Sequence, residues 1–200
     1  MKLKAILYSG LVLALLCSCV KKNYIPKPKG YNRIDMPPHA YHLSPDTLPY
    51  QFQMSDYAVL RDDSSSFDEK YWSRIVYPAY DCSVELTYYE LNNNRKFLRE
   101  LVKDAYTLTS RHQIKATGIE EAVIKTPSGK TATLLEVEGE VPSQLQFFIT
   151  DSSRNYLRGA LYFKTALKND SLAPVIRYMK EDILQMLNTT EWITPRTSRK

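Results

Sequence analysis

The chain has 200 residues, enough for one ordinary domain with flanking segments. It is 44% hydrophobic and 24% charged, so it can bury a core and lacks the composition of a disordered protein. Its mean hydropathy of −0.39 excludes a protein with many membrane spans. Three cysteines are too few for a disulfide framework or a four-ligand zinc site.

The first 18 residues have the pattern of a secretory signal peptide. Two lysines precede a short apolar run, Ala5–Leu16, which does not reach the roughly 18–20 residues that a membrane-spanning helix needs. Leu16 and Ser18 stand at positions −3 and −1 before Cys19, as in the bacterial lipobox. We therefore predict cleavage between Ser18 and Cys19 and lipidation of Cys19. Cys17 fits less well, since the bulky Leu16 would occupy its −1 position.

Removal of residues 1–18 takes away two lysines and no acidic residue, so a modest positive charge remains. Such a charge does not indicate nucleic-acid binding. A lipoprotein cysteine carries three acyl chains, including palmitate, so we expect stable membrane attachment through this lipid anchor.

Residues 19–48 are predicted to form an extended basic tether. Prolines, which lack an N–H and restrict the preceding residue, recur at Pro26, Pro28, Pro37, Pro38, Pro45 and Pro49. Lysines stand at Lys21, Lys22, Lys27 and Lys29. These lysines either contact anionic headgroups or only keep the tether solvated, and the sequence leaves both interpretations open.

Residues 49–192 are predicted to form a globular α+β domain, followed by a disordered basic tail over residues 193–200. Strand patterns occur at Pro49–Met54, Ala58–Arg61, Ser73–Tyr77, Cys82–Leu91, Ala122–Lys125, Thr131–Glu138, Gln144–Thr150 and Tyr156–Phe163. We expect the first two to pair as an edge hairpin.

Two helices complete the domain, and Trp192 is expected to pack back on it. The first is capped by Asn92–Asn94 and runs to about Lys115, and the second is capped by Asp170 or Ser171. The short loops favour antiparallel pairing, so we expect a single twisted antiparallel sheet covered by the two long helices. This order resembles the Mog1/PsbP-like fold, a likeness that says nothing about function.

No pattern of residues indicates an enzyme, a cofactor or a small-molecule substrate. His39 and His42 have an H-x-x-H spacing but lie in the tether without a nearby cysteine, so we expect no metal site. His112 falls on the apolar stripe of its helix and is interpreted as a core histidine. Cys82 is expected to pack as a small apolar residue. Phosphate-binding and nucleophile-elbow motifs are absent.

The fifteen tyrosines allow two interpretations. Aromatic residues are ordinary in strands, yet tyrosine is also enriched at protein interfaces. The candidates for a partner-binding surface are Tyr31, Arg33, Tyr41, Tyr88 and Tyr162.

Several segments resemble the GldD family of gliding-motility lipoproteins from the Bacteroidetes. Beside the lipobox, Pro26–Asp35 is similar to the opening signature of that family. Further similar segments are Pro49–Phe52, Trp72–Pro78, Lys103–Thr109, Pro142–Phe148, Arg158–Phe163 and Asp170–Ile176. The likeness extends over about residues 19–192.

The resemblance implies a non-enzymatic envelope component that is required for surface gliding, a process connected with type IX secretion. Its expected partners are other proteins of the gliding or secretion apparatus. Some lipoproteins of this phylum carry an acidic surface-export signal after the cysteine, whereas Val20–Asn23 is basic. We therefore expect a protein that faces the periplasm, attached to either the inner or the outer membrane.

The same phylum is expected to O-glycosylate Asp-Ser/Thr followed by an apolar residue. Thr47 and Ser171 fit this pattern, and Thr47 is preferred because Ser171 is expected to cap a helix. An alternative function is a lipid- or glycan-binding module of the cell envelope. A deep apolar pocket between sheet and helix would favour that alternative.

Overall fold

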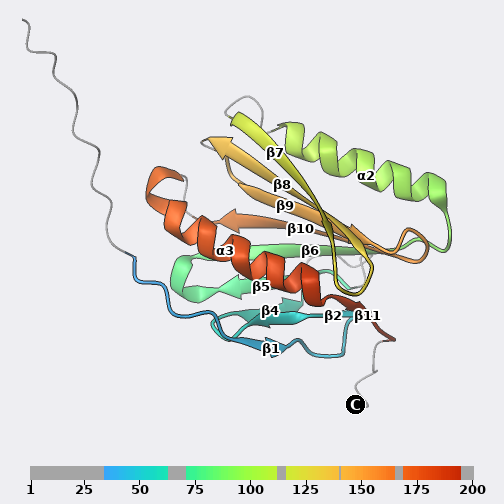
Figure 1. Ribbon diagram of the computed structural model, residues 1–200, viewed down its shortest axis with the longest axis horizontal. Coiled ribbons are helices and arrows are strands. Elements are labelled where there is room, and N and C mark those ends of the chain that lie inside the picture. Colours follow the sequence, from blue (N-terminus) through green and yellow to red (C-terminus); the bar gives the residue numbers. More distant parts are fainter. Residues whose placement is uncertain (1–33, 63–70, 112–115, 140, 165–168, 195–200) are drawn as a thin grey trace, which may run out of the picture. The chain divides into compact units, whose positions relative to one another are not determined.

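The computed structural model describes residues 34–62, 71–111, 116–139, 141–164 and 169–194, which lie in one unit spanning Asn32–Lys200 (Figure 1). Its strands are β1 (Tyr41–Leu43), β2 (Tyr50–Gln51), β3 (Gln53–Ser55), β4 (Val59–Asp62), β5 (Ser73–Tyr77), β6 (Cys82–Glu90), β7 (Ala116–Lys125), β8 (Thr131–Gly139), β9 (Leu145–Thr150), β10 (Asn155–Phe163) and β11 (Glu191–Trp192). Its helices are the 3₁₀ turn η1 (Pro78–Tyr80), α2 (Arg95–Ser110) and α3 (Asn169–Thr189).

A seven-stranded sheet forms the centre of the domain, in the order β4-β5-β6-β10-β9-β8-β7. Every neighbouring pair is antiparallel, which confirms the predicted antiparallel α+β architecture. Two small antiparallel pairs, β1 with β3 and β2 with β11, accompany it. Residues distant in sequence thereby become neighbours: Trp192 lies opposite Tyr50 and packs against the core, as expected.

The alternation along the strands explains how the sheet buries both faces. Phe147 belongs to the core cluster that contains the apolar stripe of α3, whereas Phe148 belongs to the cluster under α2. Because consecutive strand residues point to opposite faces, α3 and α2 lie on opposite sides of the sheet (Figure 1). Cys82 on β6 is 2% exposed on the α3 side, and burial raises the pKa of its thiol to about 12, so it packs as predicted.

The two helices agree with the sequence in position and differ in their ends. Asn94 caps α2, where its Oδ1 accepts hydrogen bonds from the backbone N–H groups of Lys96 and Phe97 at 3.1 and 3.0 Å. α2 ends at Ser110, before the predicted end at Lys115. Helix α3 begins at Asn169, so both predicted capping positions, Asp170 and Ser171, lie within its first turn. Among the described residues, no helix has both the length and the apolar character to span a membrane.

The predicted hairpin between Pro49–Met54 and Ala58–Arg61 is wrong. β3 pairs with β1, and β4 pairs with β5. The chain turns at Asp56, whose backbone N–H donates to the carbonyl of Ala40 at 2.9 Å, so the strand partner of β3 comes from the expected tether.

The expected tether is therefore partly folded. From Ile34 onward the chain lies on the domain, with Ile34 and Met36 packed against the core. Leu48 is 4% exposed and belongs to that core. Apolar residues between the prolines thus supply enough burial to fold this stretch against the sheet.

The β9–β10 turn is held by one carboxylate. Asp151 Oδ1 accepts hydrogen bonds from the backbone N–H groups of Ser153, Arg154 and Asn155 at 2.8–2.9 Å, while its Oδ2 accepts from the Asn155 amide at 2.6 Å. Burial acts to raise the pKa of Asp151, but the hydrogen bonds from Asn155, Ser153 and Arg154 outweigh it and lower that pKa. The ionised carboxylate therefore stabilises the folded turn.

We expect Asp151→Ala to lower the free energy of unfolding by about 1–2 kcal/mol at pH 7, because several backbone donors lose their acceptor. The contribution of Asp151 is complete above the unfolded pKa of about 3.9 and is lost as the pH falls through the lower folded pKa. Denaturant unfolding at pH 7 and near pH 3 measures it. Asp104→Ala, on the exposed face of α2, is the control. A loss that is equal at both pH values would contradict the assignment.

Candidate functional site

The strongest concentration of interacting polar groups surrounds a buried carboxylate on α3. Asp182 is 4% exposed, and its Oδ1 lies 2.7 Å from His39 Nδ1. The Tyr41 hydroxyl donates to the same oxygen at 3.0 Å. A charged side chain on the core-facing side of a helix needs such partners, because an unpaired buried charge is costly. We call His39, Tyr41, Tyr178, Glu181 and Asp182 the Asp182 cluster.

His39 makes contacts with four side chains. Its Nε2 lies 2.7 Å from Glu181 Oε2, so each ring nitrogen faces a carboxylate of α3. Its ring stacks on that of Tyr178 with the centroids 4.1 Å apart and lies parallel to that of Tyr41 at 5.9 Å. Two carboxylates and two aromatic rings therefore hold the imidazole in place. The segment before β1 is thereby fastened to α3.

The tyrosines around Asp182 have raised pKa values. Burial and then the charge of Asp182 raise the pKa of Tyr178 to about 12. The same two causes, in the same order, raise the pKa values of Tyr41, Tyr77 and Tyr80. These hydroxyls therefore stay protonated at neutral pH and surround the carboxylate with dipoles.

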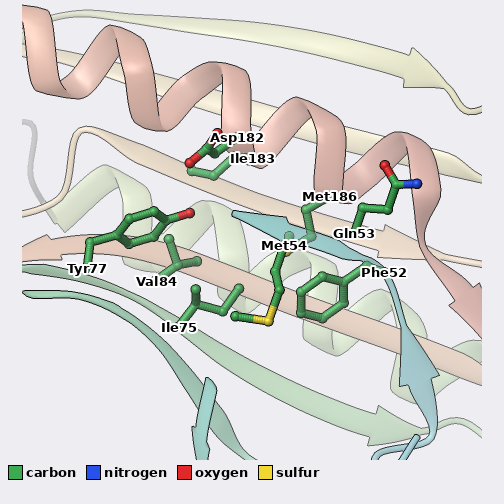
Figure 2. A pocket seen from close by; sticks show the side chains of 9 residues that line it. All are labelled: Phe52, Gln53, Met54, Ile75, Tyr77, Val84, Asp182, Ile183 and Met186. Atoms are coloured by element: carbon green, nitrogen blue, oxygen red, sulfur yellow. The ribbon is translucent and has the colours of Figure 1, made fainter. Parts of the chain in front are cut away.

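A small cavity adjoins the cluster (Figure 2). Its volume is about 10 Å³, close to the least space that one water molecule requires. It is lined by Phe52, Gln53, Met54, Ile75, Tyr77, Val84, Asp182, Ile183 and Met186. Asp182 Oδ2 is buried there, and within the described part of the chain it has no hydrogen-bond partner. One water fits beside this oxygen, whereas a lipid chain or a sugar does not.

The contacts of the Asp182 cluster indicate which chemical roles its side chains can take. Both nitrogens of His39 face carboxylates at hydrogen-bond distance. The described residues include no group of three or more side chains placed to hold a metal ion. The arrangement joins two chain segments that lie 143 positions apart in the sequence.

The predicted partner-binding residues fall in different places. Tyr41 belongs to the Asp182 cluster. Tyr88 is 8% exposed and lies in the core, where its hydroxyl donates to Asn155 Oδ1 at 2.6 Å, so the surface role expected for it does not fit. Tyr162 is half-buried on the opposite face of the sheet from Leu161, which packs toward α3. Tyr31 and Arg33 lie outside the described residues.

The predicted modification sites are only partly described. Thr47 is exposed in a turn between β1 and β2, as an accessible acceptor must be. Ser171 lies in the first turn of α3. Ser18, Cys19 and His112 lie outside the described residues.

Sequence reasoning missed the Asp182 cluster, although one signal was present. Asp182 follows Met179 and precedes Ile183, and so interrupts the apolar stripe of its helix. A carboxylate on that stripe predicts a buried partner. The partner itself, His39, is 143 residues away in the sequence, so no local pattern identifies it.

Comparisons with known proteins give one family and one structural likeness. The family model described as "Gliding motility lipoprotein GldD" matches residues 21–192. No curated protein matches the chain at a significant level.

The domain is also similar to the solution structure of cyanobacterial PsbP (CyanoP) from Synechocystis sp. PCC 6803. The identity is 10% and the TM-score 0.47, over 82% of this chain and 97% of that one. A similarity at this level supports no conclusion, and the Mog1/PsbP-like fold stays a prediction. The family match covers most of the chain and includes the segments noted in the sequence: the chain belongs to the GldD family of gliding motility lipoproteins, membrane-anchored proteins of the cell envelope.

Proposed function

We propose that this chain is a non-enzymatic, periplasm-facing component of the gliding apparatus, connected with type IX secretion, whose domain serves as a docking body for other envelope proteins. The family match supports the gliding role. The basic residues Lys21 and Lys22, in place of an acidic export signal, support the orientation toward the periplasm.

The observation that carries the docking role is the attachment of the segment before β1 to α3. His39 joins Glu181 and Asp182, both at 2.7 Å, close to where the expected tether enters the domain. A body that transmits load between a lipid anchor and a partner needs its anchor-side segment fixed to its core. The Asp182 cluster provides that fixation through an ion pair and stacked rings.

The alternative function, a lipid- or glycan-binding module, receives no support from the cavity beside Asp182. At about 10 Å³ that cavity is far below the several hundred Å³ typical of ligand sites.

The test combines a deletion strain with crosslinking in the native envelope. Loss of the gene is expected to abolish spreading on a surface, and the wild-type chain restores it. A photo-crosslinking residue at Tyr162, on the sheet, is expected to capture a gliding or secretion component. The same residue at Lys96, whose side chain is 80% exposed on α2, is the control. Normal spreading of the deletion strain, or capture of no such component at Tyr162, would contradict the proposal.

A further inference from the structure

β7 is an open edge of the central sheet. Among the described strands it pairs only with β8, so one side of this ten-residue strand presents backbone N–H and C=O groups without strand partners. Its side chains are mostly exposed. Val123, at 63%, is the most exposed large apolar side chain in the described part of the chain, and Ile119 is 38% exposed.

The register fixes which side chains share a face. Ile119, Glu121 and Val123 lie opposite Val137, Leu135 and Thr133 of β8, on the side of the sheet that α2 covers. The Tyr106 hydroxyl of α2 donates to Glu121 Oε1 at 2.6 Å, in agreement with this placement. Lys125 continues the same face, since alternate residues of a strand point the same way.

We propose that β7 pairs antiparallel with β7 of a second copy of this chain, with Val123 opposite Val123 across a two-fold axis. Such an axis is normal to the joined sheet, so each residue lies opposite one from the same face. In this register Glu121 of each copy lies opposite Lys125 of the other. Two cross-strand ion pairs then flank a central apolar contact, and Ala122 lies opposite Ile124 on the other face.

Charge selects this register over its neighbours. An axis at Glu121 places the two Glu121 carboxylates directly opposite each other, and like charges in that position are destabilising. An axis at Ala122 places Glu121 opposite Val123 and leaves Lys125 without an acidic partner. Only the axis at Val123 pairs both charges of this face.

The pairing is short, so it buries little surface and is expected to need a high local concentration. The test therefore uses the full chain in its native envelope. Val123→Cys is expected to give a disulfide-linked species of twice the chain mass, because Cα atoms of opposed antiparallel residues lie about 4.5–5.5 Å apart, within disulfide range. The native Cys82 stays unreactive, being 2% exposed with a raised pKa.

Ile119→Cys is the matched control, exposed on the same strand and face. In the proposed register its two copies lie on the order of 27 Å apart, eight strand steps, and do not crosslink. Several-fold more dimer is therefore expected from Val123→Cys than from Ile119→Cys. Equal dimer from both variants, no dimer, or a product with the mass of a different partner would overturn the proposal.

Reversal of the charges at Glu121 and Lys125 is a second test of the proposed pairing. In the Val123→Cys background, Glu121→Lys is expected to reduce the dimer several-fold. The reason is that position 121 of each copy then places a cation opposite Lys125 of the other copy. Adding Lys125→Glu is expected to restore it with the signs exchanged. This rescue separates the contact between copies from the contact with Tyr106, which Lys125→Glu does not rebuild. Failure of the rescue would also overturn the register.

Discussion

Replacement of Cys19 by alanine is expected to move the protein from the membrane fraction to the soluble periplasmic fraction. The predicted anchor is the set of acyl chains on this one residue, and each buried methylene contributes about 0.8 kcal/mol to membrane attachment. The basic residues near Cys19 contribute at most about 1 kcal/mol each and cannot replace the chains. Fractionation of cells followed by immunoblotting measures the redistribution, and metabolic labelling with palmitate is expected to disappear with it.

Cys17→Ala is the matched control, since Cys17 lies in the same segment but has Leu16 before it, where the peptidase needs a small residue. This variant is expected to stay in the membrane fraction and to keep its label. The proposed function requires the lipid anchor, so a deletion strain that expresses Cys19→Ala should fail to spread on a surface. Retention of that variant in the membrane together with normal spreading would contradict both the lipidation site and the proposed role.

Replacement of Asp182 by alanine is expected to lower the free energy of unfolding by about 3 kcal/mol, the lower end of the range for breaking a buried ion pair. His39 and Tyr41 both lose the oxygen to which they are bonded, and the cavity beside Asp182 grows. Chemical denaturation at neutral pH measures the loss. The segment before β1 should also become sensitive to proteases, because its strongest link to α3 is gone.

Glu181→Ala is the matched control, since Glu181 contacts the other nitrogen of the same imidazole but is 58% exposed. Exposed ion pairs contribute little, so this variant is expected to change stability by less than about 1 kcal/mol and to leave the segment protected. Equal effects of the two substitutions would show that Asp182 does not hold the segment to the helix.

Local patterns predicted much of the secondary structure. The alternation of Cys82, Val84 and Leu86 with polar residues predicted β6, because alternation of period two reflects one buried face of a strand. The capping of α2 by Asn94 was foreseen for a similar reason, since the side chain of a cap bonds to backbone groups two and three residues later. Both features involve only neighbouring residues.

Pairing between distant segments was predicted less well. The segments around Gln53 and Val59 have strand character and lie close in sequence, which favoured a hairpin, yet β3 joins β1 and β4 joins β5. The choice depends on which partners bury the core: Phe52 and Met54 are at most 4% exposed against α3 and the sheet. Competing burial of this kind is not visible in a local pattern.

Local features of the sequence were enough to predict the two helices, most of the long strands and the family, because spacing, capping and signature segments involve only nearby residues. The order of the strands and the contact of His39 with Asp182, 143 positions away, became visible in the folded domain alone. A buried charge receives its partners from elements that folding brings together, wherever those elements stand in the sequence. The energy of those contacts depends on the distance between atoms in space. That distance cannot be read from the separation of two residues along the chain.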